Sequence, residues 1–234
     1  MNGHPAPKGC GPTTGACAAA AALAAAKVWL GESQPERVEI VLPGGRILDV
    51  VIDSAVRRED GAEATVIKPD NDDDDATRGL AIRVRISRRE GGGIVFAAGE
   101  GVGTVTRPGL SLPPGEPAVN PTPRAMIADA LSGLDGGWRV EISVPRGMET
   151  AEKTYNPRLG IVGGISIIGR SGLVRPYCGA ARRSAFLCSF RVARESGHGM
   201  MVMVPGNIGR RAVEKRFRFA PEQLLETGNA WDDA

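Results

Sequence analysis

Long apolar runs, aromatic side chains and histidines are all scarce in this chain of 234 residues. No stretch reaches the roughly 18 consecutive apolar residues of a membrane-spanning helix, and residues 1–12 lack the charged and apolar regions of a secretory signal. We therefore expect a cytosolic protein without membrane association. The formal net charge of +2 is too small to indicate a protein that coats nucleic acid.

Only two histidines are present, and neither has an evident catalytic partner. His4 lies close to the amino terminus. His198 follows a predicted helix, where an imidazolium would suit the negative end of the helix dipole, so we expect a capping role for it. Hydrolysis by a Ser-His-Asp set is therefore poorly supported.

Cysteine is also too sparse for a disulfide scaffold. The four cysteines are Cys10, Cys17, Cys178 and Cys188, and no pair of them has the CxxC spacing of a zinc site. We expect a reducing compartment and no structural metal.

Glycine and arginine, in contrast, are abundant. The chain has 32 glycines without a collagen-like or low-complexity repeat, which indicates many turns and close backbone contacts, features common in small-molecule sites. Only five of the 29 basic residues are lysine. The excess of arginine suits bidentate binding of carboxylates, although a codon bias toward arginine explains it equally well.

Residues 1–145 predict an α+β domain with a mostly antiparallel sheet. The alanine-rich run 16–30 predicts a helix that begins after Thr13 or Thr14 and stops at Gly31. Residues 123–134 have the apolar spacing of a second helix. Alternating patterns predict a hairpin over 37–42 and 46–52 and further strands over 63–67, 80–86, 94–97 and 140–144.

Residues 146–234 predict the start of an α/β domain. The continuous apolar runs 161–168 and 200–204 are typical of buried parallel strands, and residues 176–196 can form the helix that connects them. The loop Pro205-Gly206-Asn207 then follows the second strand at its carboxyl end, where open α/β sheets usually bind ligands. One β-α-β unit is too small for a complete doubly wound sheet.

The sequence Pro12-Thr13-Thr14-Gly15-Ala16-Cys17 places hydroxyls, free N–H groups and a thiol at the start of the alanine-rich helix. Such a helix end can bind an anion or lower the pKa of a thiol. An ordinary N-cap followed by a small buried cysteine explains the same residues and is favoured on spacing alone.

Two further segments stand out by composition. The acidic run 70–75 lacks the spacing of a calcium loop, so a solvated surface turn is favoured over a cation site. The glycine-rich segment 99–106 is not followed by a helix, which argues against a dinucleotide loop but still allows close approach to a flat ligand.

Several segments together resemble the CbiD family, the cobalt-precorrin-5B C1-methyltransferases of corrin biosynthesis. The matching stretches occur in the same order along almost the whole chain and include 12–22, 38–46, 70–79, 99–127 and 155–176. The resemblance implies that S-adenosyl-L-methionine methylates C-1 of a cobalt-precorrin-5B tetrapyrrole to give cobalt-precorrin-6A. Members of the family continue well beyond the length of this chain, so the resemblance implies a truncated α/β domain.

The resemblance also suggests which side chains form the site. The substrate is a polycarboxylate macrocycle whose own carbon is the nucleophile, so the protein mainly aligns substrate and methyl donor and excludes water. The expected substrate-binding residues are Thr13, Thr14, Cys17, Arg124, Arg158, Arg170 and Arg175. The expected cofactor-binding residues are Gly99, Glu100, Gly101, Gly103, Gly163, Gly164, Pro205, Gly206 and Asn207.

Two alternatives to the methyltransferase stay open on the sequence. One is a non-catalytic tetrapyrrole-binding fragment or scaffold without a complete cofactor site. The other is an enzyme that uses Cys17 as its nucleophile, which is poorly supported because no histidine has an evident place beside that thiol. The oligomeric state is not fixed, and a homo-oligomer is one option.

Overall fold

The computed structural model describes residues 10–70, 75–174 and 179–227. Its centre is a five-stranded sheet in the order β4-β5-β6-β9-β7. The strands are β4 (Ser54–Arg57), β5 (Gly61–Ile67), β6 (Ala81–Arg89), β7 (Gly93–Ala98) and β9 (Gly137–Ser143). All neighbours pair antiparallel except β7 and β9, which are parallel. This mixed sheet confirms the predicted α+β class.

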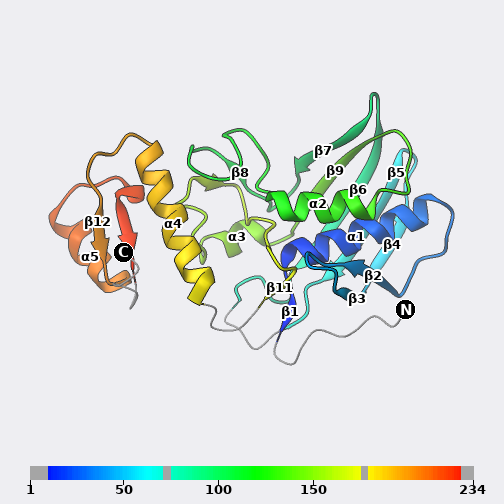
Figure 1. Ribbon diagram of the computed structural model, residues 1–234, viewed down its shortest axis with the longest axis horizontal. Coiled ribbons are helices and arrows are strands. Elements are labelled where there is room, and N and C mark those ends of the chain that lie inside the picture. Colours follow the sequence, from blue (N-terminus) through cyan, green and yellow to red (C-terminus); the bar gives the residue numbers. More distant parts are fainter. Residues whose placement is uncertain (1–9, 71–74, 175–178, 228–234) are drawn as a thin grey trace.

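Two helices cover one face of the sheet and lie side by side (Figure 1). They are α1 (Thr14–Trp29) and α2 (Pro121–Ala130). Nine alanines of α1 are buried, because their small side chains let the helix approach β5, β6 and α2 closely. The sheet contributes inward-facing residues such as Ile82, Val84 and Ile86 to the same core.

The ends of α1 follow the rules that predicted them. Thr13 is the N-cap, and its Oγ1 accepts a hydrogen bond from the Ala16 N–H at 3.2 Å. Gly31 follows the last turn with a φ of 95°, which glycine adopts without strain. At this end the Trp29 ring packs edge-on against Trp138, with centroids 5.7 Å apart, and under the Arg57 guanidinium.

A separate hairpin packs against α1. It consists of β2 (Arg37–Val41) and β3 (Ile47–Val51), which confirms the predicted hairpin, and its buried Val38, Ile40, Leu48 and Val50 join the main core. A short pair between β1 (Gly11–Pro12) and β11 (Leu173–Val174) fastens the chain just before α1.

The connection from β7 to β9 passes through α2 and forms a β-α-β unit inside the main sheet. The glycine-rich segment leaves β7 at its carboxyl end, and the short strand β8 (Thr104–Val105) then pairs with β10 (Ile161–Val162). The short helix α3 (Gly147–Ala151) follows β9 at the same end.

The carboxyl-terminal part contains α4 (Gly179–Glu195), β12 (Val202–Val204), α5 (Asn207–Arg216), the 3-10 turn η1 (Pro221–Gln223) and β13 (Leu224–Glu226). Strands β12 and β13, which precede and follow α5 in the sequence, pair in parallel. Figure 1 shows these elements at one end of the molecule, where α4 lies between the main sheet and the other elements of the group. They are called the carboxyl-terminal unit below.

The predicted parallel pairing of 161–168 with 200–204 is wrong, because β12 pairs in parallel with β13 instead. Residues 161–168 do not pair with β12: Ile161 and Val162 pair antiparallel with β8, and Ile165 and Ile167 are buried in the main core. Ile165 and Ile167 are buried without belonging to a sheet strand, a case that an apolar run alone cannot distinguish from a buried strand. The boundary at 145/146 stays a prediction.

His198 does not cap α4 with its ring. The end of α4 is closed by backbone bonds from Gly197 N–H to Arg194 O and from His198 N–H to Ala193 O, an arrangement that a glycine at this place allows. The imidazole instead lies 3.2 Å from Glu222 Oε1.

None of the helices in the described ranges combines the length and apolar character needed to cross a bilayer.

Candidate functional site

Segments far apart in the sequence converge at the carboxyl end of β7 and β9. The segment 163–169 runs through the middle of this end. Its carbonyl oxygens accept hydrogen bonds from the first turn of α1, from Gly15 N–H to Ile168 O at 2.9 Å, and from the start of α2, from Asn120 N–H to Ile167 O at 3.0 Å. Its Ile165 N–H donates to Gly101 O in the glycine-rich segment at 2.9 Å. We call this end of the sheet the carboxyl edge. It is the place where sheets with β-α-β connections usually bind ligands.

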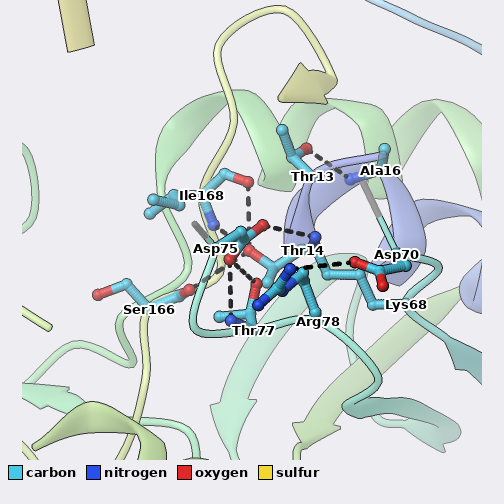
Figure 2. A network of polar contacts seen from close by, with 10 residues as sticks. All are labelled: Thr13, Thr14, Ala16, Lys68, Asp70, Asp75, Thr77, Arg78, Ser166 and Ile168. Carbon is cyan, nitrogen blue, oxygen red and sulfur yellow. Dashed lines mark hydrogen bonds and ion pairs between the residues drawn. The ribbon is translucent and has the colours of Figure 1, made fainter. Parts of the chain in front are cut away.

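Thr13 and Thr14 fasten the start of α1 to this edge (Figure 2). The Thr14 hydroxyl accepts a hydrogen bond from the Ile168 N–H at 2.9 Å and lies 3.3 and 3.4 Å from the carbonyls of Ile168 and Ser166. Both threonines are buried. Thr14 therefore holds the 166–168 segment in place, whereas Thr13 caps α1, and both hydroxyls already have partners within the chain.

Cys17 is fully buried in the first turn of α1. Burial raises the pKa of its thiol to about 12, although the nearby Lys68 ammonium lowers that pKa in part. Such a thiol is protonated at neutral pH and unreactive. The structure supports the small buried cysteine, and it does not support Cys17 as a nucleophile or as a contact for a ligand.

An ion pair that the sequence did not predict lies beneath the same turn. Lys68 is only 1% exposed, and its Nζ is 2.6 Å from Asp75 Oδ2. The other carboxylate oxygen of Asp75 accepts bonds from the Thr77 N–H at 2.8 Å and the Thr77 hydroxyl at 2.6 Å. Burial alone would raise the pKa of Asp75, but the bonds from Lys68 and Thr77 outweigh it and keep that pKa below its ordinary value.

The solvated surface turn expected for residues 70–75 is thus only partly what the structure shows. The Asp70 side chain is 80% exposed and lies 3.4 Å from Arg78, whereas Asp75 is an internal ion-pair partner. Residues 71–74 lie outside the described ranges. Asp75 was missed because its buried lysine follows a strand and has no sequence signal of its own.

Most of the predicted cofactor glycines serve close backbone packing. A Cβ on Gly101 would lie 2.0 Å from Val144 O, one on Gly164 would lie 2.0 Å from Gly101 O, and one on Gly103 would lie 2.9 Å from Gly164 O. A Cβ on Gly99 would lie 2.1 Å from Ser143 Oγ. Glu100 and Gly163 are exposed and remain accessible to a ligand.

The predicted substrate arginines are mostly engaged within the chain. Arg124 donates to Val119 O and Glu116 and lies over the Phe96 ring. Arg170 is exposed and donates to the Ser184 hydroxyl. Arg175 lies outside the described ranges.

Arg158 belongs to a set of charges between the main sheet and the carboxyl-terminal unit, here called the seam. Arg158 lies 2.7 Å from Glu226 and 3.5 Å from the Asn207 side-chain oxygen, so the structure brings the Pro205-Gly206-Asn207 loop next to it. Arg107 lies 2.9 Å from Glu222, which also contacts His198. Burial raises the pKa of Glu222, but its backbone hydrogen bond, His198 and Arg107 together hold it below the ordinary value.

Two cations at the carboxyl edge face solvent and were not predicted as site residues. Arg78 is 45% exposed in its side chain. Arg146 is exposed and follows β9, and it is the one described non-glycine residue with a positive φ, at 68°. Its carbonyl accepts bonds from the N–H and the hydroxyl of Thr150, which fix this backbone. Non-glycine residues held in this conformation are common near functional sites.

The described residues suit binding and orientation more than acid-base chemistry. Nowhere in the described ranges do three histidine, cysteine or acidic side chains gather in a way that could hold a metal ion. An open hollow of about 650 Å³ lies along α5, lined by Ile208, Arg211, Ala212, Val213, Lys215, Arg216 and Phe217, and does not include the carboxyl edge.

The chain is similar to known proteins over most of its length. A model of the CbiD family matches residues 2–176. Proteins named cobalt-precorrin-5B C(1)-methyltransferase from Syntrophotalea carbinolica and Moorella thermoacetica are 49% and 43% identical to it, each over 94% of the chain. The chain covers 63% and 60% of these two relatives, so it spans about six tenths of their length.

A crystal structure described as the cobalamin biosynthesis protein CbiD from Archaeoglobus fulgidus shares the fold, with a TM-score of 0.56 and 30% sequence identity. The similarity covers 96% of this chain and 72% of that one. The family match covers the segments that meet at the carboxyl edge, from the start of α1 through the 163–169 segment. The chain therefore belongs to the CbiD family.

Proposed function

We propose that this chain forms part of a methyltransferase that transfers a methyl group from S-adenosyl-L-methionine to C-1 of cobalt-precorrin-5B, giving cobalt-precorrin-6A. The observation that carries the proposal is the convergence of the family's segments at the carboxyl edge, around the 163–169 segment. The names of the two relatives supply the reaction.

The arrangement of side chains suits this chemistry. A methyl sulfonium is a strong electrophile and the macrocycle supplies the carbon nucleophile, so the protein has to align the two and exclude water. No reactive thiol is needed, in agreement with the buried Cys17. The substrate's carboxylates require cations at the rim of the site, and Arg78 and Arg146 are exposed there.

We assign the substrate side of the site to Arg78, Arg146 and Arg170 at the carboxyl edge. Of the expected cofactor residues, Glu100, Gly163, Pro205 and Asn207 are exposed and are retained in the proposal. We further propose that the enzyme works in the cytosol on a tetrapyrrole substrate and does not bind nucleic acid or membranes.

A non-catalytic tetrapyrrole-binding role is the second candidate. It is favoured by one observation. Neighbouring backbone occupies the space beside Gly101, Gly103 and Gly164, whereas the cations at the carboxyl edge remain exposed. Under this alternative the chain binds the macrocycle and lacks a complete cofactor site.

Isothermal titration with S-adenosylhomocysteine, with and without a cobalt-precorrin tetrapyrrole, distinguishes the methyltransferase from the non-catalytic tetrapyrrole-binding role. Binding of both ligands, followed by methyl transfer, is the expected result. Tetrapyrrole binding alone would favour the second candidate, and binding of neither would contradict both.

Variants at the carboxyl edge test the substrate side. Arg78→Ala and Arg146→Ala should each weaken tetrapyrrole binding by about tenfold, because each removes a charge-assisted contact to a carboxylate. Arg139→Ala is the matched control, since Arg139 is an exposed arginine on β9 that pairs with Glu141. Unchanged affinity in both edge variants would contradict the assignment.

A further inference from the structure

A buried ion pair lies beneath the start of α1, a kind of place where apolar side chains are often at least as stable. Lys68 and Asp75 are 1% and 15% exposed in their side chains. Removing two charges from water opposes folding, and apolar side chains of similar size at such places are often as stable or more stable. The pair therefore points to a requirement for a defined arrangement of the groups around it.

The pair closes the acidic loop between β5 and β6. The ends of the loop are joined by bonds from Lys68 N–H to Leu80 O and from Gly79 N–H to Lys68 O, both at 2.9 Å. Asp75 then bonds the Lys68 ammonium across the loop and also holds Thr77, while the Arg78 N–H donates to Asp75 O at 3.1 Å. The ion pair thus joins Asp75 to Lys68 across the loop, and the same carboxylate holds the Thr77 N–H, while main-chain bonds hold Arg78 and Gly79.

The same pair lies against the first turn of α1. Both charges act on the thiol of the fully buried Cys17. Figure 2 shows the pair close to Thr14, whose hydroxyl bonds Ile168. From there the contacts continue through the Ser166 hydroxyl to Asn156 and from Asn156 to Gly164 O, which packs against the glycine loop.

We propose that Lys68 and Asp75 are positioning residues that place the Arg78 side of the acidic loop against the start of α1, so that Arg78 is held ready for a carboxylate of the tetrapyrrole. Neither member of the pair touches the ligand. The inference rests on the proposed function for the identity of the ligand, whereas the fixing of residues 77–79 by the pair is independent of it.

The test replaces both charges together, because removal of one would leave the other buried and unpaired. In Lys68→Met/Asp75→Leu, the protein is expected to fold with a melting temperature near that of the wild type. Hydrogen exchange of the Thr77, Arg78 and Gly79 amides should accelerate by about tenfold, and cobalt-precorrin tetrapyrrole affinity should fall by about tenfold. Arg37→Met/Asp49→Leu is the matched control, since that exposed pair has the same 2.6 Å separation on the β2–β3 hairpin.

A stable double variant with unchanged exchange at 77–79 and unchanged affinity would overturn the proposal. If the double variant does not fold, Lys68→Arg and Asp75→Glu keep both charges but shift the contact. Faster exchange at 77–79 in these variants, with retained stability, supports the proposal, and wild-type exchange and affinity in both overturn it. Should the wild type bind no tetrapyrrole, the proposed function fails, and the exchange measurement alone decides the role of the pair.

Discussion

At the scale of single residues, Cys17 lies in a motif that could have supplied a reactive thiol, but in the structure it is a buried core residue. Its thiol is fully buried in the main core, and burial raises its pKa to about 12. At pH 7 almost no thiolate is present, and the thiolate is the reactive form of cysteine.

We therefore expect Cys17 to react far more slowly with iodoacetamide at pH 7 than Cys10 and Cys188, which are partly exposed. Mass spectrometry of the separated peptides would measure the three rates. Labelling of Cys17 in folded protein at the rate of Cys10 would contradict its burial.

Gly101 is the second residue whose role changes between sequence and structure. It has a φ of 70°, and a Cβ there would lie 2.0 Å from Val144 O, a backbone atom that cannot move aside. Gly101→Ala should lower the free energy of unfolding by about 3 kcal/mol or more. Urea titration would measure this loss.

Gly115→Ala serves as the control for that substitution. Gly115 also has a positive φ, at 92°, but no atom lies within 4 Å of its Cβ position. The control should lose only the conformational part, about 1 kcal/mol. Equal losses in both variants would show that close packing at Gly101 is unimportant.

At the scale of elements, the acidic loop links stability to pH. Asp75 has a folded pKa below its ordinary value of 3.8. A carboxyl group of this kind stabilises the fold fully above its unfolded pKa, and the stabilisation disappears as the pH falls through the folded pKa.

Wild-type protein should therefore lose part of its stability on acidification below about pH 4, beyond the loss in Lys68→Met/Asp75→Leu. Urea midpoints measured from neutral pH down to about pH 3 would show it. Identical pH profiles for the two proteins would contradict the role of this pair in the pH dependence.

Most elements were predictable, since their signals are local. The alanine run, its cap at Thr13 and the hairpin around Pro43-Gly44-Gly45 each specify their own structure. The parallel pairing of β7 with β9 and the placement of 161–168 were not predictable, because both depend on which distant strand or helix covers an apolar run. The same limit applied to the site.

The composition indicated that arginines bind the substrate's carboxylates, but it could not show which arginines already pair with groups of the chain itself. Arg124 and Arg158 pair with acidic side chains of this chain and are half-buried, whereas Arg146 and Arg78 are exposed at the carboxyl edge, Arg78 with the exposed Asp70 as its partner. Deciding between them requires the positions of Glu116 and Glu226 in three dimensions.

At the scale of the whole molecule, the main sheet and the carboxyl-terminal unit meet through charges at the seam. Gly109 packs against the backbone of α4 at Arg191, and Arg107 and Arg158 bond Glu222 and Glu226 beside it. Partly exposed ion pairs of this kind weaken in salt.

Arg107→Met/Arg158→Met should loosen the carboxyl-terminal unit while the main core stays folded. We expect faster hydrogen exchange around Val192 and Ala193, which are buried in α4, and unchanged exchange in β6. Salt should produce a similar change in the wild type and little further change in the variant. Arg139→Met is the control, and equal exchange in all three proteins would contradict the role of the seam.

The nine buried alanines of α1 have a mechanical consequence. Alanine side chains have no rotamers to adjust, so the contacts around the buried alanines of α1, a helix about 24 Å long, cannot absorb a displacement by side-chain rearrangement. A ligand that shifts the 166–168 segment, to which Thr14 is bonded, would thereby displace α1 and move Trp29 at its other end, where the ring lies between Trp138 and Arg57. Tryptophan emission should change on tetrapyrrole binding in the wild type, and Trp29→Phe should remove most of that change; α1 thus makes the far end of the molecule an optical reporter of events at the carboxyl edge.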